Sequence, residues 1–149
     1  MFNKETMKAT GKVNVVLKDE HGNVKEDFTV SNLVVDTGLD FIASRMKDAT
    51  ATAMSHMEVG TDNTAAASGD TALGSAVGSS RTALTSTTVT DNAVEYICTF
   101  GAGTGTGALT EAGIFNASSA GDMLCRTVFS VINKGASDSM TITWTVTIS

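Results

Sequence analysis

The residues of this chain that could do chemistry are few and widely spaced. His56 and Glu58 stand two positions apart, so both side chains would share one face of a strand and could contact the same metal ion. Metal sites in proteins need further ligands, and no third ligand is evident beside this pair. A solvated or ion-paired strand face explains the pair better, and we expect no metal.

Glycine occupies every second position from Gly101 to Gly107, in a pattern that superficially resembles a phosphate-binding loop. A P-loop ends in Lys-Ser or Lys-Thr, and a dinucleotide-binding loop leads into a helix whose N-terminus binds the phosphates. Neither feature follows these glycines. The segment is therefore interpreted as a flexible connector, and no cofactor is expected.

Hydrolytic chemistry finds no support either. The chain has no Gly-x-Ser-x-Gly motif, and its two histidines are His56 and a turn-like His21. Glu111 and Asp122 bracket a pair of expected strands, but two carboxylates alone do not make a glycosidase. The cleft aromatics of a sugar site are scarce, with one Trp and one Tyr. We predict that the protein is not an enzyme.

The composition indicates one domain with an unusual surface. A chain of 149 residues is long enough to bury a core without metals or disulfides. It contains no proline, is rich in threonine, and has 17% charged residues, where an average soluble protein has roughly a quarter. Threonine favours strands because its branched side chain fits a pleated surface. These features predict a β protein whose surface is partly covered by neighbours.

The net charge of −6 is distributed without a basic stripe. Nucleic-acid binding needs clustered Lys and Arg side chains, so we expect no nucleic-acid partner. No apolar run approaches the roughly 18 residues of a membrane span, and the N-terminal residues lack a signal-peptide pattern. We therefore expect no membrane association, and folding in a cytoplasm.

The two cysteines, Cys98 and Cys125, have no metal-binding or redox spacing. Both fall in alternating apolar runs. This favours two buried thiols, because free cysteine is among the most buried residue types. A disulfide between neighbouring strands is the alternative.

Alternation of apolar and polar residues predicts most of the secondary structure. Residues 11–18 and 24–30 form one expected hairpin, and residues 83–90 and 93–100 form another around Asp91-Asn92. Shorter strands are expected over residues 54–60, 108–116 and 123–129. The clearest strand covers residues 140–149, where apolar side chains alternate with Thr141, Thr143, Thr145 and Thr147.

One helix is expected over residues 38–47, because Leu39, Ile42, Ala43 and Met46 recur at helical spacing, with Thr37 as its cap. The Ala-, Gly- and Ser-rich residues 61–80 form a long loop, which is either an arm ordered by a partner or a mobile loop. Residues 1–10 could form an N-terminal arm. The chain is thus predicted to be one domain over residues 1–149: an all-β, antiparallel β-sandwich or jelly-roll of about eight strands with one short α-helix.

The last third of the chain resembles a module of tailed-bacteriophage virion proteins. In that module a Glu-x-Gly-Ile-Phe strand is followed by a Gly-centred turn, a strand with an apolar-Arg pair, a Lys-containing loop and a terminal strand that alternates around Trp. The matching pieces are residues 111–115, Gly121, residues 124–129, Lys134 and residues 140–148. Residues 31–38, Ser-Asn-Leu-Val-Val-Asp-Thr-Gly, also resemble an Asn-Leu-Val-Val entry segment of the same proteins.

The resemblance implies a virion structural protein, assembled in the host cytoplasm. The absence of repeats and heptads argues against a fibre shaft. We therefore expect a capsid decoration (cement) protein, a homotrimer that binds the major capsid protein and stabilises the assembled shell by bridging its subunits. A tail or fibre-associated protein that adapts or binds a receptor is the alternative.

Candidate interface residues follow from exposure and composition. They are Phe2 in the arm, Leu73 and Val77 in the long loop, and Thr143 and Thr145 on the closing strand. Solvent-facing strands often carry Lys or Glu, so a face of threonines predicts a further strand or subunit over it. A sugar-binding module, with a host-surface glycan as partner, is a third class. It is disfavoured because Trp144 and most Phe side chains are expected in the core.

Overall fold

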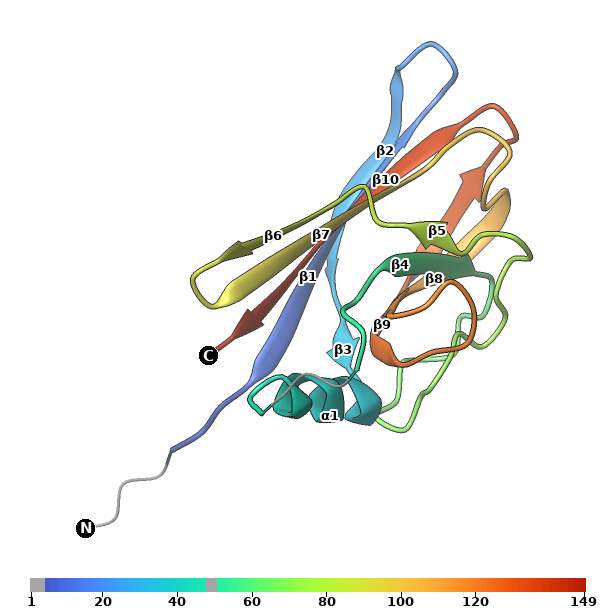
Figure 1. Cartoon of the computed structure of the whole chain (residues 1–149). Helices are drawn as coiled ribbons and strands as arrows, with labels where there is room; N and C mark the ends of the chain where they lie inside the picture. The colour runs from blue at the N-terminus through green and yellow to red at the C-terminus, as the bar shows by residue number, and fades with distance from the viewer. Residues whose placement is uncertain (1–4, 48–50) are drawn as a thin grey trace.

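The computed structural model describes residues 5–47 and 51–149 of the chain. Two antiparallel five-stranded sheets pack against each other, and one short helix lies at one end of them (Figure 1). The protein is therefore an all-β sandwich, which confirms the fold class predicted from the alternating sequence pattern. The structure has ten strands, where the sequence predicted about eight, because two of them span only two residues.

Sheet A has the strand order β2-β1-β10-β7-β6, with every neighbouring pair antiparallel. Its strands are β1 (Ala9–Lys18), β2 (Val24–Ser31), β6 (Ser86–Thr90), β7 (Ala93–Phe100) and β10 (Ser139–Ile148). Both predicted hairpins are present, as β1–β2 and β6–β7. The last strand of the chain, β10, lies in the middle of the sheet between β1 and β7.

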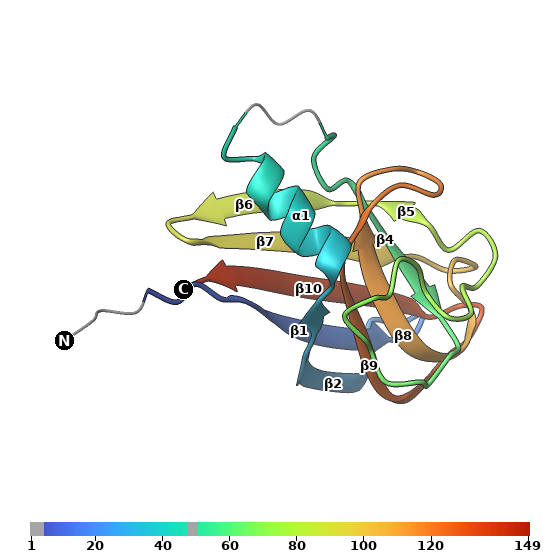
Figure 2. The same cartoon turned by 90° about the horizontal axis from the view of Figure 1, so that it is seen from below.

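Sheet B has the order β3-β9-β8-β4-β5. Its strands are β3 (Leu33–Val34), β4 (His56–Gly60), β5 (Thr82–Ala83), β8 (Gly107–Phe115) and β9 (Met123–Lys134). Along the described residues, the chain begins in sheet A and passes between the sheets four times, entering sheet B at β3 and β8 and sheet A at β6 and β10 (Figure 2). Because strands far apart in the sequence become neighbours, the fold depends on long-range pairing.

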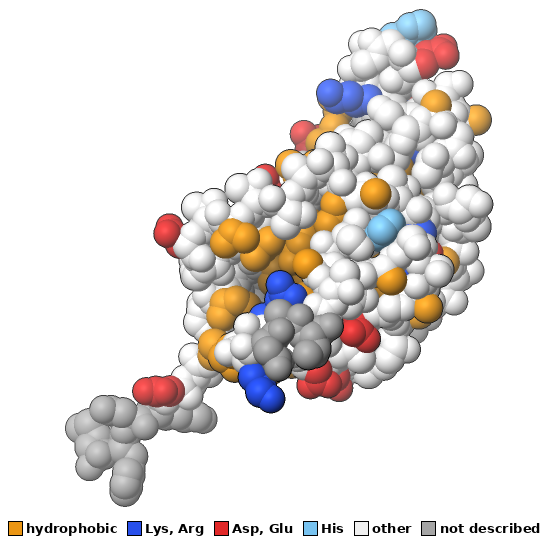
Figure 3. All heavy atoms as spheres, in the orientation of Figure 1, with side chains coloured by type: hydrophobic (Ala, Val, Ile, Leu, Met, Phe, Trp, Pro, Cys, Tyr) orange, Lys and Arg blue, Asp and Glu red, His pale blue; other side chains and the backbone are white. Residues whose placement is uncertain are grey.

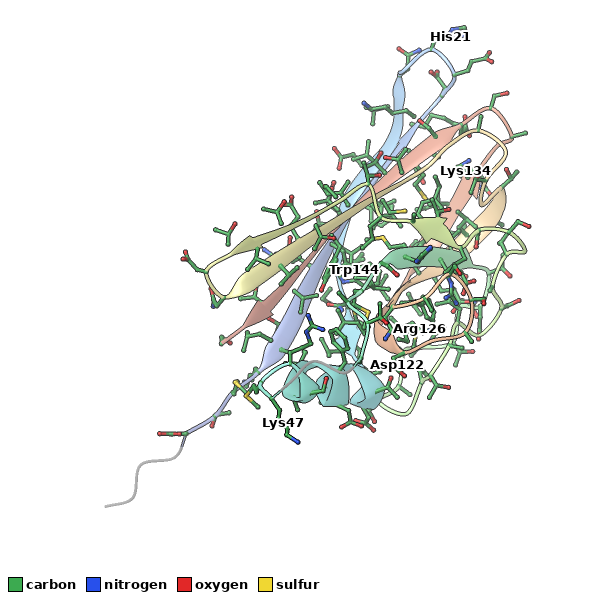
Figure 4. The ribbon with its side chains drawn as sticks, in the orientation of Figure 1. His21, Lys47, Asp122, Arg126, Lys134 and Trp144 are labelled. Carbon is green, nitrogen blue, oxygen red and sulfur yellow. The ribbon has the colours of Figure 1, made fainter. Side chains whose placement is uncertain are left out.

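The core between the sheets is built by the period-two alternation of the strands. Each strand turns alternate residues inward, and in β10 these include Ile142, Trp144 and Val146. Trp144 is fully buried near the centre of the sandwich (Figure 4). Phe100, Phe115 and Phe129 are also buried, so most of the aromatic area that a sugar site would use is in the interior.

Helix α1 (Asp36–Ser44), predicted over residues 38–47, packs against β9 of sheet B. Thr37 does not cap it: Val35 holds the N-cap position without a side-chain bond, and the Thr37 hydroxyl donates to the Met123 carbonyl at 2.9 Å. Of the predicted apolar stripe, Ile42 packs against the core, whereas Leu39 is 47% and Met46 is 78% exposed.

Gly38 explains why the helix turns this way. It is the buried residue of α1, and its backbone packs directly on the Leu124 carbonyl of β9. A Cβ atom at this position would collide with that backbone oxygen. At Gly38 the helix therefore contacts β9 through its backbone and not through an apolar side chain, and hydrophobic periodicity does not detect such a contact.

This contact makes Gly38 sensitive to a single methyl group. We expect Gly38→Ala to lower the free energy of unfolding by about 2 kcal/mol, because the added atom must displace helix from strand. Urea denaturation measures the loss. Gly69→Ala is the matched control, since nothing lies within 4 Å of a Cβ there. Equal stability of the two variants would contradict the proposed packing.

Candidate functional site

The residues that could have held a metal have other partners. On β4, Glu58 Oε2 lies 3.2 Å from the Arg81 Nε, and the His56 Nδ1 lies 2.7 Å from the Ser55 hydroxyl. Within residues 5–47 and 51–149, no group of three His, Cys, Asp or Glu side chains is placed to hold a metal ion. Glu58 therefore belongs to an ion-paired strand face.

The glycine-rich segment is a turn between β7 and β8. No helix follows it, because Gly107 is the first residue of β8. The Lys134 ammonium group donates to the Gly101 carbonyl at 2.9 Å, and this side chain is only 2% exposed. Burial lowers the pKa of Lys134. The lysine therefore fastens the turn to the end of β9 (Figure 4).

The most elaborate polar cluster lies on the outer side of sheet B, around Glu111 of β8. Its side chain is fully buried, and Arg126 of β9 is 2% exposed. The Arg126 Nε and Nη2 atoms lie 2.9 and 2.8 Å from one Glu111 oxygen. Arg126 Nη1 also reaches Asp70 at 3.0 Å. Two strand residues and one loop residue thus share a buried ionic network.

The loop over residues 61–80 is held onto sheet B by this network. The Glu111 carboxylate accepts hydrogen bonds from the backbone N–H groups of Gly74 at 3.0 Å and Ser75 at 2.7 Å, and a longer one from Asp62. A hydrogen bond from the Thr64 backbone lowers the pKa of Asp62. The loop is therefore bonded to its own sheet, a contact that neither interpretation of the sequence included.

The burial of Leu73 is a consequence of the same arrangement. Leu73 was a candidate interface anchor, but it is 9% exposed and packs with Val35, Phe115 and Met123 in a small second core. Val77 is half-buried against the main core. The loop conformation thus turns Leu73 away from any partner. Phe2, the anchor expected in the arm, lies outside the described residues.

Sequence reasoning missed the pairing of Glu111 with Arg126. Glu111 was compared with Asp122 as a pair of carboxylates and matched to the start of the virion-like motif, and the structure keeps the two carboxylates in different places. Asp122 lies in the exposed turn after β8, where its backbone N–H donates to Asn116. That turn is held by Arg81, whose guanidinium lies over the Phe115 ring at 3.7 Å and donates to the Ala117 carbonyl. The sequence did contain one signal for the pairing of Glu111 with Arg126: these residues of opposite charge lie on two strands that follow each other along the chain.

The outer face of sheet A is the broad surface that this chain leaves open. At its centre, Thr143 of β10 aligns with Asn14 of β1 and Ile97 of β7. Most side chains of the face carry hydroxyl groups, and its charged residues include Lys12, Asp27 and Glu95 on the strands around β10. The hydroxyl-bearing residues of the face are Ser139, Thr141, Thr143, Thr145 and Thr147 of β10, Thr10 of β1, Thr29 and Ser31 of β2, Thr99 of β7, and Ser86, Thr88 and Thr90 of β6.

Thr143 and Thr145, the two candidates on this face, are half-buried although they lie in the middle strand. Their partial exposure shows that no described strand packs over them. Of the two coverings predicted from the sequence, a further strand of the same chain is therefore absent from the described residues. A second molecule remains as the covering that the composition predicts.

Two apolar grooves flank helix α1. The first encloses about 340 Å³ between the helix and the β6–β7 end of sheet A, where apolar side chains gather (Figure 3). Its walls include Phe41, Ile42, Val89, Val94, Tyr96 and Ile148. The second lies between α1 and the start of β1, where Met7 is 68% exposed. Neither groove contains a pair of catalytic side chains among its lining residues.

Both cysteines are free and buried, and no disulfide joins them. This confirms the interpretation as buried thiols. Burial raises the pKa of Cys98 to about 12 and that of Cys125 well above its usual value. Since the thiolate is the reactive form, neither group has the properties of a nucleophile at neutral pH.

No protein-family model, curated protein or solved structure matches this chain. In the described residues, no helix has the length and apolar composition to cross a membrane.

Replacing Glu111 tests the buried network. We expect Glu111→Gln to lower the free energy of unfolding by about 3 kcal/mol, because every group around the carboxylate is a donor and the new amide NH₂ would face one of them. Hydrogen exchange should show faster exchange at Gly74 and Ser75. Glu95→Gln, on the outer face of sheet A, is the control. Unchanged protection of the loop would contradict this role.

The thiols give a second test. We expect Cys98 and Cys125 to resist an aromatic disulfide reagent in the folded protein at mildly alkaline pH, because both stay protonated and enclosed. Both should react at once after unfolding in guanidinium chloride. Absorbance of the released thiol measures the rate. Fast reaction of either cysteine in the native protein would show that its surroundings open easily.

Proposed function

We propose that this protein is a structural subunit of a tailed-phage virion, and that it decorates the capsid by binding the assembled shell. The observation that carries the proposal is the uncharged stripe of hydroxyl-bearing residues along β10, at the centre of the open outer face of sheet A. The cores of protein interfaces are depleted in charged residues, because desolvating a charge is costly. Sheet B cannot offer such a face, since its own loop covers it.

The sequence resemblance supports the choice of partner. Its pieces fall on β8, the turn that follows, β9 and β10, so they describe three successive strands of the sandwich. In the virion proteins that this pattern resembles, such domains are accessory parts of a larger particle. The major capsid protein is therefore the partner that we propose.

The proposed mechanism needs no chemical step. A protein that binds the assembled shell and not its free subunits shifts the assembly equilibrium toward the shell by mass action. A rigid, disulfide-free sandwich suits this role, because little ordering is needed on binding. Threonine contributes short side chains, which lose little conformational entropy when they are covered.

The location in the particle tests the proposal. Cryo-electron microscopy and quantitative mass spectrometry of the parent virion should find this chain on the icosahedral shell, in numbers that match the capsid lattice. A low copy number at the tail would reject decoration in favour of the tail or fibre alternative. Absence from purified particles would overturn the virion proposal altogether.

Two charges placed on the outer face should weaken binding. We expect Thr143→Lys with Thr145→Lys to reduce affinity for preassembled shells about tenfold or more, because the ammonium groups must be desolvated at the interface. Co-sedimentation with shells measures binding. Thr64→Lys, on the exposed side of the long loop, is the matched control. Normal binding by the double variant, with normal stability, would mean that this face stays exposed to solvent and is not the binding surface.

A further inference from the structure

The four edge strands of the two sheets differ in how they are protected from pairing. Exposed edges invite another strand, and proteins block them with charges, bulges or very short strands. In sheet B, the edge strands β3 and β5 have two residues each. In sheet A, β2 carries Lys25, Glu26 and Asp27, and its pairing with β1 is shifted near Leu17.

The fourth edge, β6, has none of these protections. Its five residues, Ser-Thr-Thr-Val-Thr, contain no charge and pair with β7 in unbroken register. All five are exposed. Val89 is 70% exposed, which makes it the most exposed large apolar residue within any described strand. In an antiparallel pair alternate residues bond to the neighbour, so the others present their N–H and C=O groups to the free side.

We propose that β6 is a self-association edge, at which two copies of this chain join through antiparallel β6–β6 pairing. A twofold axis through Thr88 places Thr88 opposite its own copy. It also sets Thr87 opposite Val89 of the partner, and Ser86 opposite Thr90. The two sheets A then form one continuous ten-stranded sheet.

A second copy is the occupant because the strand is complementary to itself. With no charge in β6, the twofold arrangement brings no like charges face to face along the pairing strands, which would be destabilising. Thr and Val are both β-branched residues that favour such pairs. The inward side of the new strand pair, with Val89, borders the apolar groove beside Tyr96, so pairing also covers part of that groove.

This inference does not rest on the virion proposal, because it uses the edge of sheet A and not its face. It differs from the homotrimer that the resemblance implied, since an isologous strand pair closes as a dimer. The contact is small, so we expect it to be weak in solution and to strengthen when a lattice holds the copies close together.

Sedimentation equilibrium of the full chain, up to about 0.1 mM, tests the pairing. The wild-type protein should dimerise, and Thr88→Lys should weaken the dimer at least about tenfold, because it sets two ammonium groups opposite each other. Thr29→Lys, on the β2 edge of the same sheet, should dimerise like the wild type. A monomer at every concentration, or a dimer indifferent to Thr88→Lys, would overturn the proposal.

Cross-linking tests the register. Thr88→Cys should form a disulfide-linked dimer under mild oxidation, because directly opposed residues have Cα atoms about 5 Å apart, within disulfide range. Thr90→Cys should not, because its own copy would lie about 13 Å away along the strands. The native thiols are buried and do not compete. Equal cross-linking of both variants would reject the twofold axis at Thr88.

Discussion

The ion pair of Glu111 and Arg126 is the interaction on which the arrangement of this molecule depends. Two charges that are almost fully buried are tolerated only when each is paired and hydrogen-bonded. Sheet B supplies the pair itself, and the loop over residues 61–80 supplies the remaining donors and the Asp70 carboxylate. The strands and the loop therefore need each other: without the loop, the pair would be left incompletely bonded on an open sheet.

This dependence makes the two sheets unequal. Sheet B has its outer face sealed by its own loop, with Leu73 in a small core beneath it. Sheet A has no such cover, and its outer face is a lattice of threonines around β10. The outward side of β10 carries hydroxyl groups and no charge, although Lys12 of β1 and Glu95 of β7 lie beside it. Under the capsid proposal, this stripe is the part of the face that the partner would cover, because hydroxyl groups are cheaper to desolvate than charges.

What could be predicted from the sequence was local. The alternation from Met140 to Ile148 predicts β10 and its buried face, and it does so without knowing that β10 is central. The hairpins of sheet A follow from neighbouring runs with a short turn between them. The loop could not be predicted, because Glu111 bonds residues 36 and 37 positions away, and Arg126 bonds Asp70 across 56 positions. The buried face of α1 could not be predicted for a related reason. Gly38 packs on the backbone of Leu124, and glycine contributes nothing to an apolar stripe.

The open face and the open edge belong to the same sheet, and this has a geometrical consequence. An antiparallel pairing of two identical strands has its twofold axis perpendicular to the sheet, so both outer faces point to the same side. A β6–β6 dimer would thus present two threonine faces in one surface. Once one face is bound, the second is held near its own site at high effective concentration, so overall binding strengthens without any new kind of contact. The two contacts would then strengthen each other. Pairing at β6 places two threonine faces in one binding surface, and binding to a lattice raises the local concentration of the chains that pair at β6.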